Sequence, residues 1–106
     1  MRYLLLLSTD GPAPAGDLQR YTADLIRAGV LLAGELLAAE DGAHLQLAVD
    51  GPRTNADLLP ISAVRPAALW IVQAADRAEA VEWARRVPLG RGRVEVRRIV
   101  TGAAEA

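Results

Sequence analysis

The stretch AALWIVQAADRAEAVEWARRVP, residues 67–88, contains both kinds of element from which this fold is built. Its first eight residues are rich in β-branched and aromatic side chains and predict a buried, central strand. The rest predicts a helix over residues 76–87, because Asp76 and Glu79 have the spacing of a capping box and Pro88 would end the helix. The stretch therefore predicts a strand that leads into a capped helix. The helix residues expected to be buried are Ala80, Val81, Ala84 and Val87, with Trp83 at the margin.

A second strand and helix precede this stretch. The short apolar run RYLLLLS (2–8) predicts a strand, and residues 16–29 predict a helix with Asp17 as N-cap and Gly29 as C-cap. The same pattern of strand and helix thus occurs twice in the chain. The apolar stripe of this first helix is expected to contain Leu18, Tyr21, Leu25 and Ala28, with Ile26 beside it.

Three further segments complete the order of elements. Residues 30–38 predict a strand interrupted by Gly34, and residues 93–100 predict a closing strand. Between them, AHLQLAV (43–49) alternates cleanly and is followed by the turn dipeptide Asp50-Gly51 and a returning segment over 53–59. The fold class is therefore α+β, a ferredoxin-like βαββαβ with an extra β-hairpin. Residues 1–100 form one domain, and residues 101–106 are expected to be a loose tail.

Two helices can cover only one face of such a sheet. The other face, carrying either Trp70 and Val72 or Leu69 and Ile71, would be exposed to water. Because a monomer rarely exposes so much apolar surface, we expect a homodimer in which two sheets pack face to face, a dimeric α+β barrel.

Composition narrows the range of functions. The chain has 106 residues, a net charge of −1 and no cysteine, so it offers no thiolate chemistry and no electrostatic case for nucleic acid. No segment approaches the ~20 apolar residues that span a bilayer, and the run 3–7 is too short for a secretory signal. We expect a cytoplasmic protein without a membrane partner.

Three residues are candidate proton carriers. His44 is the single histidine and shares a strand face with Gln46; imidazole gains or loses a proton near neutral pH. The alternative for His44 is an exposed polar residue. Glu35 and Asp57 are catalytic candidates if buried and ordinary surface carboxylates if solvated. One histidine without companions at ligand spacing predicts no metal site, and we expect no cofactor.

The candidates for ligand binding are an arginine, an amide and two aromatic residues. Arg65 precedes Pro66 in a loop and could orient a ligand carboxylate. Trp70 and Tyr21 are either core residues or pocket walls, and Gln46 would accompany His44. Separately, the closing strand places three charges on one face, which predicts a cross-strand charge ladder at a sheet edge; they are Arg93, Glu95 and Arg97.

Several stretches in this order resemble the YCII-related, or DGPF, family: MRYLLLL (1–7), LIRAGVLLAGELL (25–37), AEAVEWARRVP (78–88) and GRVEVRRI (92–99). The resemblance extends from Met1 to about residue 100. It implies a dimeric α+β barrel and enzymes of small-molecule chemistry, several near secondary metabolism, without fixing a reaction.

The Asp-Gly-Pro of VDGPRT (49–54) is not the signature for which that family is known. In the family an Asp-Gly turn comes first, and counting from residues 33–35 places this turn at Asp50-Gly51. The signature should then fall near Asp57, where ADLLPIS retains only Asp57 and Pro60 of it. A related branch has a His on the first helix and an Asp near the end of the second; both are missing. The active-site residues of the family therefore cannot be transferred.

Two functions remain open. One is a cofactor-independent enzyme that isomerises, cyclises or eliminates from a largely apolar organic substrate, with His44, Glu35 and Asp57 moving protons. The other is a non-catalytic ligand-binding or interaction module on the same dimeric scaffold. A closed cavity that holds His44 beside a carboxylate would favour the enzyme, and a solvated His44 would favour binding.

Overall fold

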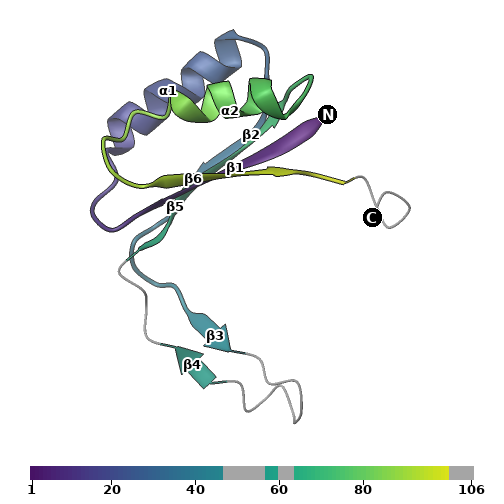
Figure 1. Cartoon of the computed structure of the whole chain (residues 1–106). Helices are drawn as coiled ribbons and strands as arrows, with labels where there is room; N and C mark the ends of the chain where they lie inside the picture. The colour runs from purple at the N-terminus through teal and green to yellow at the C-terminus, as the bar shows by residue number, and fades with distance from the viewer. Residues whose placement is uncertain (47–56, 60–63, 101–106) are drawn as a thin grey trace.

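The computed structural model describes residues 1–46, 57–59 and 64–100. Its main sheet has four antiparallel strands in the order β2-β5-β1-β6 (Figure 1). The chain order of strands and helices confirms the predicted ferredoxin-like α+β class. Residues 67–73 lie in an inner strand as expected, and Ala74 follows its end. The elements are β1 (Arg2–Thr9), α1 (Ala15–Arg27), β2 (Leu31–Leu36), β5 (Arg65–Gln73), α2 (Arg77–Arg85) and β6 (Arg93–Arg98).

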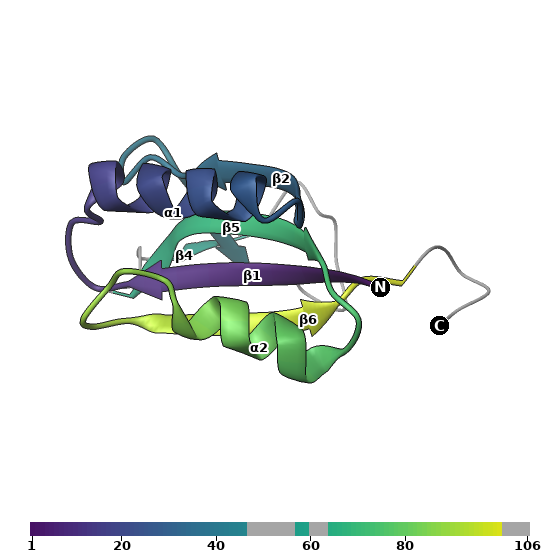
Figure 2. The same cartoon turned by 90° about the horizontal axis from the view of Figure 1, so that it is seen from above.

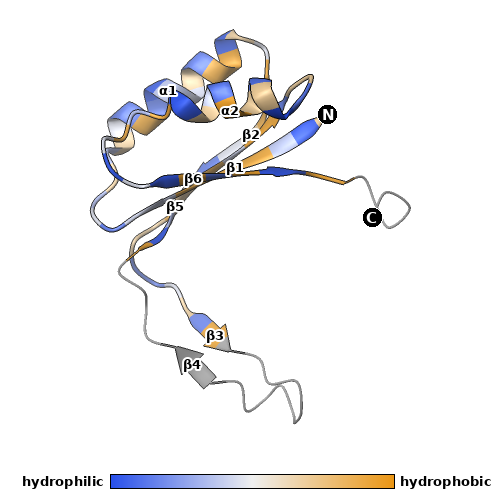
Figure 3. Ribbon diagram, in the orientation of Figure 1, coloured by the Kyte–Doolittle hydropathy of each residue, from blue (hydrophilic) through white to orange (hydrophobic). Residues whose placement is uncertain are grey.

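Both helices lie on the same face of this sheet, as Figures 1 and 2 show from two directions. Both apolar and polar residues occur along α1 (Figure 3), and its buried residues Leu18, Tyr21 and Leu25 have the spacing of three and four residues that an amphipathic helix requires. No helix in the described part of the chain is long and apolar enough to cross a membrane; the cytoplasmic location stays a prediction. The core between helices and sheet contains Tyr3, Leu5, Leu7, Leu18, Tyr21, Leu25, Trp70 and Val72.

The opposite face of the sheet is not covered by any described element. Leu4 pairs with Ile71 and Leu6 with Leu69, and all four side chains are partly exposed. Of the two sets considered from the sequence, Leu69 and Ile71 thus face away from the helices. We call this surface, defined by these four residues, the open face.

The start of α1 differs from the prediction. The helix begins at Ala15, with Pro14 at the cap position and no side-chain cap, so Asp17 is not the N-cap. Asp17 instead lies in the first turn and pairs with Arg20, where its negative charge suits the helix dipole. At the other end, Gly29 adopts a φ of +74°, just beyond the C-cap residue. Ile26 is 61% exposed and Ala28 is exposed as well, so the buried stripe is narrower than expected.

The start of α2 agrees with the predicted capping box. The Asp76 carboxylate accepts a hydrogen bond from the Glu79 N–H at 2.9 Å, and the Glu79 carboxylate accepts one from the Ala75 N–H at 3.3 Å. Ala80 is fully buried, and Trp83, Ala84 and Val87 are partly buried against the core. Val81 is also partly buried but lines the groove between α2 and β6. The helix ends before Pro88, as predicted.

The predicted hairpin is a separate unit of two short strands, β3 (His44–Gln46) and β4 (Asp57–Leu59). His44 pairs with Leu59, and Gln46 with Asp57. The hairpin projects from one end of the main sheet (Figure 1), and Leu45 is 52% exposed rather than packed under the helices. The proposed turn Asp50-Gly51 and the tail 101–106 lie outside the described residues.

The charges on β6 do not form the cross-strand ladder that the sequence predicted. β6 is an edge strand, as expected, but Arg97 and Glu95 lie opposite Leu4 and Leu6 of β1. Their ion pair runs along β6 itself, at 3.2 Å. The ladder fails because the neighbouring strand offers only apolar side chains at these positions.

Candidate ligand-binding site

Two adjoining pockets lie at the end of the sheet from which the hairpin leaves. The first, the hairpin pocket, has a volume of about 470 Å³ and is lined by residues 37–39, 42–44 and 64–66. The second, the α1 pocket, has a volume of about 280 Å³ and is lined by residues 9, 11–13, 15, 18, 36, 37, 39 and 65–67. Leu37, Ala39, Arg65 and Pro66 line both, so these residues form the wall between them.

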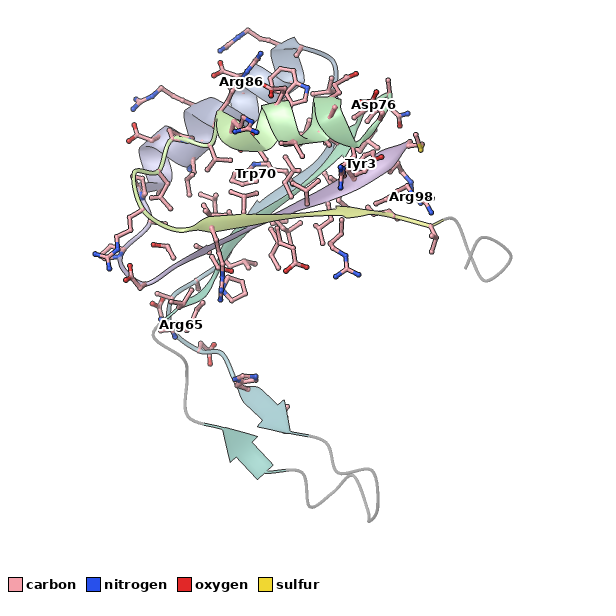
Figure 4. The ribbon with its side chains drawn as sticks, viewed as in Figure 1. Tyr3, Arg65, Trp70, Asp76, Arg86 and Arg98 are labelled. Atoms are coloured by element: carbon pink, nitrogen blue, oxygen red, sulfur yellow. The ribbon has the colours of Figure 1, made fainter. Side chains whose placement is uncertain are left out.

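Arg65 is the charged residue on this shared wall. It is the first residue of β5, paired through its backbone with Thr9, and Figure 4 shows it where the sheet meets the hairpin. It is partly buried and forms no ion pair within the described part of the chain. A partly buried guanidinium without a counter-ion among apolar neighbours is suited to an anionic ligand.

His44 also lines the hairpin pocket. The side chain is exposed, and within the described residues it has no carboxylate as a hydrogen-bond partner. The structure thus brings His44 and Arg65, two of the residues singled out in the sequence, to one pocket. The buried His–carboxylate pair that would favour catalysis is not found among the described residues.

The two candidate carboxylates lie elsewhere or cannot be placed. Glu35 is exposed on β2, pairs with Leu69 on the open face, and lines neither pocket. Asp57 lies opposite Gln46 in the hairpin; the side chains of both are outside what the structure describes. Of the three predicted proton carriers, His44 alone is therefore placed at the pocket by the described residues.

Tyr21 and Trp70 are core residues, one of the two alternatives left open by the sequence. Trp70 is fully buried, and its indole N–H donates a hydrogen bond to the Thr22 hydroxyl at 2.8 Å. The Tyr21 hydroxyl donates to the Trp83 carbonyl oxygen at 2.6 Å, and its ring meets Trp70 edge-on at 4.9 Å. Burial raises the pKa of Tyr21 far above its ordinary value, although Arg86 opposes the shift. Neither side chain lines the two pockets, so their positions give no support to a role in ligand binding.

Part of the α1 pocket comes from a loop that was not among the segments predicted to bind a ligand. The loop between β1 and α1 has the sequence DGPAP (10–14), and three of its residues line the pocket. Leu36 and Leu37, at the end of β2, contribute from the other side. The available signal was a loop with almost no polar side chains, which is unusual for a segment fully exposed to water.

Other parts of the described surface are weaker candidates for a functional site. A groove of about 960 Å³ lies between α2 and β6, but its charged side chains are exposed, Asp76 caps α2, and Arg85 pairs with Glu82 at 3.3 Å. Within the described residues no three His, Asp or Glu side chains gather as a metal site requires. The absence of a cofactor stays a prediction from the sequence.

Comparison with known proteins identifies a protein family for this chain. A model of the YCII-related domain matches residues 1–102, which include every described strand and helix. Among the curated proteins, none matches this chain.

Proposed function

The chain belongs to the YCII-related family, and from this premise we propose that it binds a small, largely apolar organic acid at the hairpin pocket, with Arg65 holding the carboxylate. The observation that carries the proposal is the position of Arg65. It is partly buried, has no ion-pair partner in the described structure, and lies on the wall of a pocket whose other lining residues, apart from His44, are apolar. A guanidinium fits a carboxylate through two parallel hydrogen bonds. Apolar walls would then bind the rest of the ligand.

The pocket favours an organic acid over an inorganic anion. Apart from Arg65 and His44, the side chains that line it belong to leucine, alanine, valine and proline, with one glycine. These side chains offer no hydrogen bonds to the remaining oxygens of a phosphate or sulfate. A ligand with one carboxylate and an apolar body leaves fewer polar groups without a partner.

A second candidate is the acid–base enzyme of the sequence analysis. The observation that favours it is that His44 lines the same pocket as Arg65. With the ligand held by its carboxylate, the imidazole would take a proton from one carbon or oxygen and return it to another. Isomerisation, cyclisation or elimination would each need such a transfer, and none requires a cofactor. Such reactions are common in biosynthesis of small organic molecules.

We also propose that the protein is a homodimer joined through the open face. The face carries Leu4, Leu6, Leu69 and Ile71 at its centre and no described helix covers it. A second copy would bury the same apolar side chains on both partners, as a two-fold interface does.

Binding of 4-phenylbutanoate and of its uncharged amide tests the role of Arg65. By isothermal titration calorimetry, we expect the acid to bind the wild-type protein about tenfold or more tightly than the amide, as a charged hydrogen bond implies. The Arg65→Gln variant should lose this difference. Arg77→Gln, at an exposed position on α2, is the matched control and should keep it. Equal binding of acid and amide to the wild-type protein would contradict the proposal.

The His44→Ala variant separates the two candidates. If the protein is an enzyme, NMR spectra of bound small acids should show conversion by the wild-type protein and none by the variant, with the dissociation constant unchanged. If the protein only binds its ligand, neither form converts any acid that it binds.

A further inference from the structure

We infer that the ligand has two parts, a carboxylate at Arg65 and a compact apolar group, a ring or a short branched chain, that occupies the α1 pocket. This inference rests on the proposed function and names the class of acid. Its starting point is the shared wall, because Arg65 lines both pockets and an acid held at Arg65 in the hairpin pocket therefore lies next to the α1 pocket.

The lining of the α1 pocket offers few polar groups to a ligand. Two polar residues line this pocket, Arg65 and Thr9, and Thr9 is 8% exposed. The Thr9 hydroxyl already accepts a hydrogen bond from the Gly11 N–H at 3.4 Å. The other lining residues are glycine, alanine, proline and leucine, which favour an apolar occupant.

The size of the α1 pocket sets the size of that group. An apolar cavity of about 150 Å³ is enough for a benzene ring, and the α1 pocket has about 280 Å³. It therefore has room for one ring or a branched chain of similar bulk.

The wall formed by the loop before α1 is restricted in its backbone. Pro12 lines the pocket, and Pro14, with a φ of −76°, precedes the first residue of α1. Proline rings limit the conformations that this wall can adopt without a ligand. Less conformational freedom is then lost when the apolar group binds.

Affinities of butanoate and 4-phenylbutanoate test the inference, because the two acids differ only in the terminal ring. By isothermal titration calorimetry, the wild-type protein should bind 4-phenylbutanoate at least about tenfold more tightly, the gain that burial of one aromatic ring gives. Ala13→Phe would fill the α1 pocket. It should remove this preference and leave the affinity for butanoate unchanged.

Two further variants keep the test decisive. Ala15→Leu fills the same pocket from the first turn of α1 and serves if Ala13→Phe does not fold. Ala28→Phe places the same ring on an exposed residue that lines neither pocket and should behave as the wild-type protein. A preference that survives both filling variants, or no preference in the wild-type protein, would overturn the inference. In that case, if both acids still bind and Arg65→Gln abolishes their binding, the proposed function stands and only the inference about the α1 pocket fails. If neither acid binds the wild-type protein, the proposed function and the inference both fail.

Discussion

Gly34 leaves the space in which the Trp70 ring packs against β2. A Cβ atom at Gly34 would lie 2.9 Å from Trp70 Cδ1, and Trp70 is fully buried. The ring is also held by its hydrogen bond to Thr22. The interruption seen in the sequence of this strand is therefore a packing requirement of the core.

The Gly34→Ala substitution should lower the free energy of unfolding by about 1–3 kcal/mol, because the added methyl group overpacks a filled site. Urea denaturation followed by tryptophan fluorescence measures this change. Gly16→Ala is the matched control: it lies in the first turn of α1, where a Cβ would meet nothing within 4 Å. That variant should be as stable as the wild-type protein or slightly more so. Equal losses in both variants would contradict the packing argument.

Tyr21 connects α1 to the end of α2 through its hydroxyl and has a pH dependence of its own. Burial raises the pKa of this phenol, so the folded protein keeps the proton at a pH where an unfolded tyrosine, with a pKa of about 10, loses it. Above about pH 10 the unfolded state then binds fewer protons than the folded state. The stabilisation present below that pH is lost as the pH rises.

Tyr21→Phe should cost about 0.5–1.5 kcal/mol at neutral pH, the net value of the hydrogen bond to the Trp83 carbonyl. The difference between wild type and variant should shrink as the pH rises above about 10, because phenylalanine has no proton to lose. Urea denaturation between pH 7 and 11 measures both effects. A difference that stays constant over this range would show that the pKa of Tyr21 is the same in the folded and the unfolded state.

At the scale of single elements, the start of α2 depends on one aspartate. Asp76 accepts the hydrogen bond from the Glu79 N–H, a group that has no partner within the helix. Asp76→Ala should lower the free energy of unfolding by about 1 kcal/mol. Asp76→Asn keeps an oxygen that can accept the bond and should lose much less. Chemical denaturation of the wild-type protein and the two variants measures these changes. Equal losses of stability in both variants would show that the charge of Asp76, and not its hydrogen bond as the cap, stabilises the helix.

The elements with strong local signals could be predicted, and those that depend on context could not. Asp76 and Glu79 define α2 by their spacing, and the apolar run of β1 needs no partner to be recognised. Asp17 suits the first turn of a helix as well as its cap, so the sequence alone could not fix the start of α1. Alternation in β3 tells which residues share a face, but not that Leu45 would be exposed on a hairpin away from the core.

The candidate site was even harder to predict from the sequence than the single elements were. Thr9, Leu36 and Arg65 come from three segments, and their meeting depends on the pairing of β1 and β2 with β5. One sequence does not specify that register. Glu35 and His44 are close in the chain, yet the first lies on the open face and the second at the hairpin pocket. Residue types alone therefore suggested that His44, Glu35 and Asp57 act together. The folded chain instead places His44 and Arg65 at one pocket.

At the scale of the whole molecule, the two faces of the sheet are unequal. One is covered by both helices and holds the fully buried residues; the other leaves Leu4, Leu6, Leu69 and Ile71 partly exposed. Charged residues flank this apolar centre on both edge strands, Glu35 on β2 and Glu95 and Arg97 on β6. An apolar centre with a charged rim is the composition of a protein interface rather than of a free surface.

The assembly proposed for this face predicts its behaviour in solution. Sedimentation velocity should give the wild-type protein a mass near twice the 11.3 kDa of one chain. Leu69→Lys places an ammonium group in the middle of the interface on each of the two copies. One unpaired buried charge costs about 3–5 kcal/mol, so the two together should make dissociation about 10⁴-fold or more easier. Leu45→Lys changes a leucine that is 52% exposed on the hairpin and should leave the mass unchanged. Circular dichroism confirms that both variants are folded. A wild-type protein with the mass of one chain at micromolar concentration would mean that the open face has another partner or none, because two copies that bury it should associate well below that concentration.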